Sequence, residues 1–240
     1  MGEFFNLDNK VFQSINKIVD CLALSVLWII CSIPVFMTGY LGYATSSLIF
    51  WLVSCITVAP AGVATTALYY AVNKVIRHGR SYIWTEFWHS FRSNFKQTSI
   101  VSMILSLVAV ILAGDGYIMY QYAKDGQKMG SLYIVFVIFL IFEIAWAIYI
   151  FPYMARFENT TKQVLKNTAY IAIANLPRTI IMVVVFAAVC LAVYMFPVIL
   201  IIVPSIFMLL VNLLMEKVFR KYMSEEDIAA EVERNRDTYN

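Results

Sequence analysis

The chain has 240 residues, of which 61% are hydrophobic and only 14% are charged, and its formal net charge is +3 at pH 7. Soluble domains are about 45–50% apolar and about 25% charged, so this composition is typical of a membrane protein and argues against a soluble enzyme. So few basic residues also argue against a nucleic-acid-binding protein.

Residues 1–17 lack the basic segment, short apolar core and small-residue cleavage site of a signal peptide, so we expect the first apolar run to remain as a membrane span. The four cysteines all lie inside apolar runs, with no cysteine or histidine at metal-ligand spacing. We interpret them as small buried apolar residues.

The apolar runs predict six membrane-spanning helices, because each is close to the roughly 20 residues that a helix needs to cross the hydrocarbon core. One uncharged run extends over residues 179–215, which is too long for a single straight span, and we expect it to reverse at Pro197. A turn at Thr38–Gly39 separates the first two runs. The predicted spans are 21–37, 40–59, 98–118, 132–154, 179–196 and 198–215.

The basic residues predict the orientation of these spans. Sixteen of the 18 Lys and Arg lie before the first span, in residues 73–97, in residues 155–178 or after residue 215. Cytoplasmic connections carry the excess of Lys and Arg, so six spans place both termini and both basic loops in the cytoplasm. Five spans would put the basic tail opposite the basic loops. We therefore expect an all-α polytopic membrane bundle with one membrane-embedded domain, residues 1–222, and a charged cytoplasmic tail, residues 223–240.

Residues 62–97 predict two amphipathic helices at the cytoplasmic membrane interface. In the second, SYIWTEFWHSFRSNFKQ (residues 81–97), the aromatic side chains fall on one helical face with basic residues beside them. One interpretation is a helix that rests on lipid, and another is a stripe that packs under other spans or against a partner membrane protein. The candidate interface residues are Trp84, Phe87, Trp88, Phe91 and Phe95, with Arg92 and Lys96.

Glu143 is the one acidic residue near the middle of a predicted span. An ionisable group at that depth is costly and usually faces a partner or a cavity. Three interpretations stay open: a proton or cation site of a transporter, a polar contact with a partner helix, or a protonated side chain that is hydrogen-bonded inside the bundle.

Motifs of common membrane machines and enzymes do not occur in the sequence. It has no Gly-rich phosphate loop and no Glu-Ala-Ala-type loop by which an importer permease docks its ATPase. The two histidines, His78 and His89, lack the spacing of metal ligands. We therefore expect a protein that is not an enzyme and that has no cofactor.

Four segments carry a resemblance to a known family: FFNLDNKVFQSINKIVD, LWIICSIPV, TTALYYAVNKVIRHGRSYIWTEFWHSFRSNFKQ and ARFENTTKQVLKNTAYIAIANLPRTI. In this order they resemble the YesL-like family of bacterial membrane proteins, labelled domain of unknown function 624, over about residues 4–220. In that family the SIPV-type stretch is followed almost directly by the TTALYY stretch, whereas residues 36–63 intervene here. If residues 40–59 were not a full span, the N-terminus would lie outside.

The resemblance implies a protein of Gram-positive bacteria, encoded beside components of sugar ABC importers and carbohydrate-responsive regulators. We therefore expect an accessory or regulatory subunit in the cell membrane that contacts lipid, importer permease subunits and possibly the ATPase subunit. One alternative is a stand-alone small-solute or proton-coupled transporter centred on Glu143. Another is a membrane sensor or scaffold that uses the tail, residues 223–240.

Overall fold

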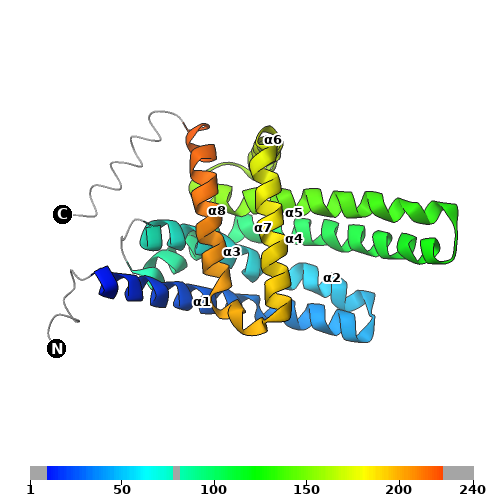
Figure 1. Cartoon of the computed structure of the whole chain (residues 1–240), viewed down its shortest axis with the longest axis horizontal. Helices are drawn as coiled ribbons and strands as arrows, with labels where there is room; N and C mark the ends of the chain where they lie inside the picture. The colour runs from blue at the N-terminus through cyan, green and yellow to red at the C-terminus, as the bar shows by residue number, and fades with distance from the viewer. Residues whose placement is uncertain (1–9, 78–81, 224–240) are drawn as a thin grey trace.

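The computed structural model describes residues 10–77 and 82–223, and the regular elements in these ranges are all helices (Figure 1). In chain order they are α1 (Lys10–Thr45), α2 (Leu48–Thr57), α3 (Ala59–Ala71), the π-helix η2 (Val72–Arg77), α4 (Ile83–Lys124), the 3₁₀-helix η3 (Lys128–Leu132), α5 (Tyr133–Arg156), α6 (Thr161–Ala174), α7 (Leu176–Met195), the 3₁₀-helix η4 (Pro197–Ile201) and α8 (Val203–Arg220).

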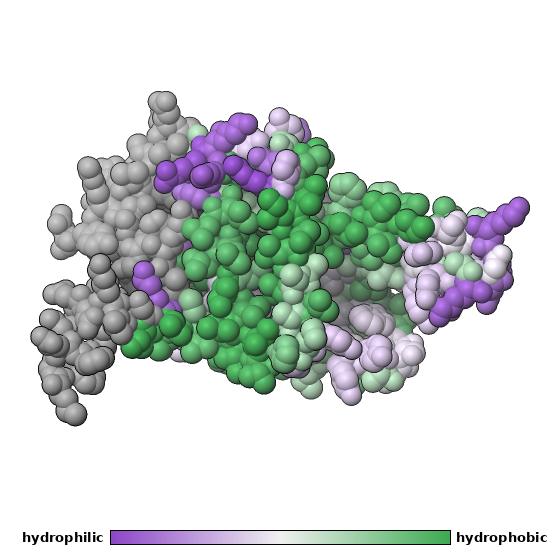
Figure 2. Space-filling view, in the orientation of Figure 1, coloured by the Kyte–Doolittle hydropathy of each residue, from purple (hydrophilic) through white to green (hydrophobic). Residues whose placement is uncertain are grey.

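Five helical stretches in the described residues are long and apolar enough to cross a membrane, which confirms the predicted all-α membrane fold. Figure 2 shows the apolar surface that such a protein presents to lipid, with polar residues at the tip of the α4–α5 hairpin. The five stretches are Ile15–Thr45, Leu48–Val75, Ile83–Lys124, Lys128–Arg156 and Leu176–Met195.

The helices form two groups with different directions. Helices α1, α2 with α3, α4 and α5 run back and forth along the long axis of the molecule, and the α7–α8 hairpin crosses them (Figure 1). The α4–α5 hairpin extends beyond the other helices. At 42 residues, α4 is about 63 Å long, twice the roughly 30 Å of a hydrocarbon core.

Helix α3 lies at the centre of the bundle and contacts α1, α4, α5 and α8. Its sequence, APAGVATTALYYA, is rich in small residues, and ten of its 13 residues are buried. Small side chains let helix backbones approach closely, which is the main way helices associate in lipid. The closest approach is at Gly62, where a Cβ atom would lie 2.6 Å from the Cβ of Ser102 on α4.

The prediction of separate spans at residues 21–37 and 40–59, with a turn at Thr38–Gly39, is wrong. Helix α1 continues through both residues to Thr45, and the Thr38 hydroxyl donates a hydrogen bond back to the Pro34 carbonyl at 2.9 Å. The chain reverses at Ser46, whose φ of 50° is the left-handed conformation of a tight turn. The second membrane-crossing stretch is therefore Leu48–Val75, and residues 40–59 are divided between α1, the turn, α2 and the start of α3.

The prediction that residues 62–77 lie at the membrane interface is also wrong. Val63, Ala64 and Ala67 are fully buried, and Leu68 is 1% exposed. The larger side chains of residues 62–77 form an amphipathic pattern when they are considered alone. The alanines and threonines between them are small enough to be buried as well. A helix that can be buried on all sides belongs in a core.

The later spans agree more closely with the sequence. Predicted span 98–118 falls inside α4, spans 132–154 and 179–196 fall inside α5 and α7 except for one residue at an end of each, and the chain reverses at Pro197 as expected. Predicted span 198–215 begins later, because residues 197–201 form the turn η4 and α8 starts at Val203. With Glu216, Lys217 and Arg220 in its 18 residues, α8 is not among the five long apolar stretches.

The predicted outer turns do not all gather at one end. The turns after α1 and after α4 lie towards the same end of the molecule, while the η4 turn lies apart from them (Figure 1). The orientation of the termini and the count of six spans stay predictions. Residues 224–240, which make up almost all of the predicted tail, lie outside the described residues.

Replacing Gly62 with Ala should destabilise the protein, because the added methyl group would overlap Ser102 and separate α3 from α4. Overpacking of this kind costs about 1–3 kcal/mol. Thermal unfolding in detergent measures the effect. Gly39→Ala is the matched control, since nothing lies within 4 Å of its added methyl group. Equal melting temperatures for both variants would contradict the close approach.

Candidate functional site

The first four turns of α4 contain the aromatic stripe that the sequence indicates. Phe87 is fully buried, and Phe91 packs against the core with its ring 6.1 Å from that of Phe87. Two of the five predicted interface rings are therefore covered by the protein itself. These two rings fix the first turns of α4 to the bundle, so the aromatic stripe as a whole does not rest on lipid.

The remaining predicted residues lie on the exposed side. Trp84 and Trp88 are 56% and 36% exposed, and with Thr85, His89, Arg92 and Ser93 they line a shallow depression. We call these six residues the tryptophan face. Phe95, 46% exposed, and Lys96, also exposed, follow in the next turn of the helix.

Trp88 is held in place by the buried ring of Phe87 and the partly buried ring of Phe91. Its ring lies edge-on to Phe87 at 5.7 Å and to Phe91 at 5.2 Å. Exposed aromatic residues supported in this way lose little conformational entropy when they bind, and Trp and Arg are the residues most enriched at the energetic centres of protein interfaces. The tryptophan face is chemically suited to a protein partner or to the lipid headgroup region.

A partly buried ion pair positions the start of α4. Glu86 is 6% exposed, and its carboxylate lies 2.9 Å from the Lys74 ammonium group on η2. The ammonium group also lies 5.5 Å from the centre of the Tyr70 ring. The pairing of Glu86 with Lys74 ties η2 to α4 on either side of residues 78–81.

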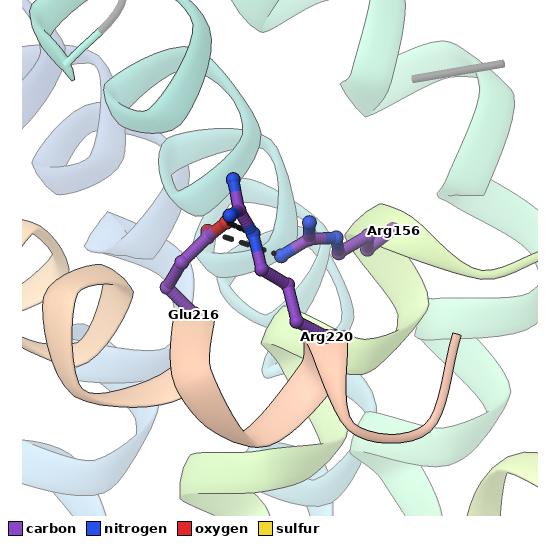
Figure 3. A network of polar contacts seen from close by, with 3 residues as sticks. All are labelled: Arg156, Glu216 and Arg220. Atoms are coloured by element: carbon purple, nitrogen blue, oxygen red, sulfur yellow. Dashed lines mark hydrogen bonds and ion pairs between the residues drawn. The ribbon is translucent and has the colours of Figure 1, made fainter. Parts of the chain in front are cut away.

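A second ion-pair network joins α5 to α8 (Figure 3). The Glu216 carboxylate accepts hydrogen bonds from Arg156 at 3.2 Å and from Arg220 at 2.7 Å. The side chains of Arg156 and Glu216 are 7% and 12% exposed, whereas that of Arg220 is 64% exposed. In the sequence, Arg156 is one of several basic residues in the predicted connection 155–178. Nothing in the spacing of these residues indicates a contact with Glu216, 60 residues later.

Tyr153, one helical turn before Arg156, binds side chains of the segments that follow α5. Its hydroxyl accepts hydrogen bonds from the side-chain amides of Asn159 and Asn167, both at 3.0 Å. Gln97 on α4 donates to the Asn159 carbonyl at 2.7 Å. Hydrogen bonds close to the ion pair therefore join the end of α5 to the connection between α5 and α6 and to the middle of α6, and join that connection to Gln97 on α4.

Glu143 lies on the side of α5 that faces α4. Two neighbouring contacts, Gly116 with Phe136 and Thr98 with Met154, set the antiparallel register of the two helices and put Glu143 opposite Ala109. Both carboxyl oxygens of Glu143 are buried and have no hydrogen-bond partner among the described residues. The interpretation of a hydrogen-bonded side chain inside the bundle is therefore not supported, although the burial itself is as expected.

The described residues contain no group of three or more His, Cys, Asp or Glu side chains that could hold a metal ion. The elements and sites above are those of a helical membrane protein with a structured polar end. Residues 21–115 match the model of the family described as "Protein of unknown function, DUF624". No curated protein and no solved structure matches the chain.

The match supports the predicted resemblance to the domain of unknown function 624 over residues 21–115. It covers most of α1, all of α2 and α3, and α4 as far as Asp115, and so includes the tryptophan face. Glu143 and the Arg156–Glu216 pair lie outside the matched region.

Replacing Glu216 with Ala should lower the stability by about 3–5 kcal/mol, because it leaves the Arg156 charge buried without its carboxylate. The double variant Arg156→Met, Glu216→Leu should recover most of the loss, since apolar residues can replace a buried ion pair at little cost. Chemical unfolding in detergent measures both. Lys217→Ala, an exposed neighbour, is the control, and a Glu216→Ala variant as stable as this control would contradict the assignment.

Proposed function

We propose that this protein is a non-enzymatic accessory subunit that binds another membrane protein through the tryptophan face, at the cytoplasmic side of the cell membrane. The observation that supports this most directly is the division of the aromatic stripe. Phe87 is buried in the bundle and Phe91 is partly buried against its core, while Trp84, Trp88 and Arg92 remain on an exposed surface supported by these rings. An interfacial helix that only rests on lipid has no need for this internal support.

The proposed partner is a carbohydrate ABC importer, either through its permease subunits or through its ATPase. The resemblance of the sequence to a family encoded beside such importers supports this choice. The absence of phosphate-loop and permease-docking motifs from the sequence fits a subunit that accompanies the importer and performs neither of its central tasks. The proposal includes cytoplasmic termini, on the strength of the basic residues around the spans.

Affinity purification of the tagged protein from native membranes in mild detergent, followed by mass spectrometry, tests the proposal. Importer permease or ATPase subunits should be recovered with the wild-type chain. The double variant Trp84→Ala, Trp88→Ala should recover at least about tenfold less of these importer subunits, because a Trp at the centre of an interface typically contributes about 2 kcal/mol or more to the binding free energy.

Tyr43→Ala is the matched control, since Tyr43 is an exposed aromatic residue (79%) near the C-terminal end of α1 and outside the tryptophan face. It should leave the recovery of importer subunits unchanged. Recovery of no importer subunit above background would remove the importer as the partner. Equal recovery with the double variant and the control would remove the tryptophan face as the binding surface.

A second candidate function is proton-coupled or small-solute transport, and the buried, unpartnered carboxyl group of Glu143 favours it. Carboxyl groups inside membrane spans often serve as proton relays. A transporter site normally combines several polar groups near the midplane with broken helices. Glu143 is the one acidic residue near the middle of a predicted span, so transport is the second choice.

Replacing Glu143 with Gln should abolish transport by the reconstituted protein if the carboxyl group carries the coupling proton, because an amide cannot release a proton. Uptake of protons or small solutes into proteoliposomes is the measurement. Glu158→Gln, an exposed carboxyl at the end of α5, is the control. Uptake that is unchanged in Glu143→Gln would exclude Glu143 as the coupling site.

A further inference from the structure

A large apolar cavity lies where the α7–α8 hairpin crosses α1, α3 and α5. Its volume is about 620 Å³, within the range of about 300–1,000 Å³ typical of ligand pockets. Leu68 and Val211, both almost fully buried, belong to its floor. Phe36 and Tyr194, both exposed, belong to its rim, and Figure 2 shows the surface hollowed beyond α7, between α5 and the end of α1.

The chemistry of the lining selects an apolar ligand. The residues that line the cavity are aliphatic or aromatic apart from Thr65, Cys190 and the hydroxyl group of Tyr194 at the rim. The Thr65 hydroxyl already accepts a hydrogen bond from the Trp28 indole at 2.9 Å and donates one to the Ala61 carbonyl at 2.8 Å. No charged side chain of the described chain lines it, so it offers nothing to a sugar, an ion or a nucleotide.

Hydrogen bonds hold the cavity open by fixing the hairpin to the bundle. At the start of α7, the hydroxyl groups of Tyr149 and Thr179 lie 2.9 Å apart. At the start of α8, Ser25 on α1 donates to Ser205 at 2.9 Å, and the Ser205 hydroxyl donates to the Cys21 carbonyl at 2.8 Å.

The end of α8 is fixed by the ion pair of Glu216 with Arg156. With both ends of α8 and the start of α7 held in place, the hairpin cannot move inward to close the cavity without breaking buried polar contacts. Each such contact is costly to lose when its groups are left unsatisfied.

The size of the cavity limits its occupant. One turn of an α-helix with its side chains, about 10–12 Å wide and 5.4 Å long, fills roughly 400–600 Å³, so the cavity has room for about one turn and not for a membrane-spanning partner helix. A methylene group takes about the volume of a water molecule, roughly 30 Å³, so the space suits roughly twenty methylene groups. That is the size of one acyl chain.

We propose that this cavity binds one acyl chain of a membrane phospholipid, which enters from the bilayer over the rim formed by Phe36, Ile144, Cys190 and Tyr194. Helices α1, α5 and α7, which supply much of the lining, are apolar enough to cross a membrane, so the rim faces hydrocarbon. The chain fills a space that close-packed proteins do not leave empty. The bound lipid stabilises the crossing of the hairpin over the bundle.

Photocrosslinking of the purified full-length protein tests this proposal without any importer present. The protein is reconstituted in vesicles of phosphatidylglycerol that carries a diazirine on one acyl chain, and crosslinked residues are mapped by mass spectrometry. Crosslinks should concentrate on the cavity lining. Ala147→Phe, which fills the cavity, should reduce these crosslinks about tenfold or more, whereas Ala187→Phe, on an exposed part of α7, should not.

Cys190→Trp provides a second test at the exposed rim, where a larger side chain is tolerated by the fold and should block entry. Crosslinks spread evenly over the apolar surface, and unchanged in both blocking variants, would overturn the proposal. Labelling of the cavity by a diazirine-bearing polyisoprenyl phosphate in preference to the phospholipid would also overturn it. So would a crosslink in the cavity to a second copy of the chain.

Discussion

The close packing of small residues along α3 is the constraint on which the rest of the structure depends. Helices in lipid gain no hydrophobic free energy by associating, so they associate where their backbones can approach. Gly62 and the alanines of α3 provide that approach towards α4, and α3 also contacts α1, α5 and α8. Because one short helix supplies the contact surface for four others, the bundle is organised around it and does not form a simple ring of spans.

Polar contacts determine how the α7–α8 hairpin lies across the bundle, which the small residues of α3 do not determine. The pairs Ser25–Ser205, Tyr149–Thr179 and Arg156–Glu216 join segments that are far apart in the sequence and fix the α7–α8 hairpin across the bundle. Helices that cross touch over a short length, so the space beside the contact is not filled by side chains. The apolar cavity is a consequence of this crossing, and its lining is apolar because apolar segments of α1, α3, α5, α7 and α8 meet there.

The length of α4 connects the membrane bundle to its exposed end. The helix continues without a break from the tryptophan face, through the contact of Ser102 with α3, to the tip of the α4–α5 hairpin. The rings of Phe87 and Phe91, which pack on the core, and the Lys74–Glu86 pair hold its first turns on the bundle. A partner bound to the tryptophan face would therefore contact a rigid continuation of the membrane core, which suits an accessory subunit.

The sequence by itself determined the class of protein, the family and most of the helices. Runs of apolar residues must be helical in lipid because every backbone polar group needs a partner, and this is why α4, α5 and α7 were predicted. The reversal at Pro197 was predicted because the uncharged run around it is too long for one span. The turn at Ser46 was missed because lipid tolerates Thr38 and Gly39 inside a helix. Tertiary structure alone decided that α3 is buried and that Glu216 lies beside Arg156. Both depend on which helix faces are brought together, and contacts between distant segments leave no periodic signal in the chain.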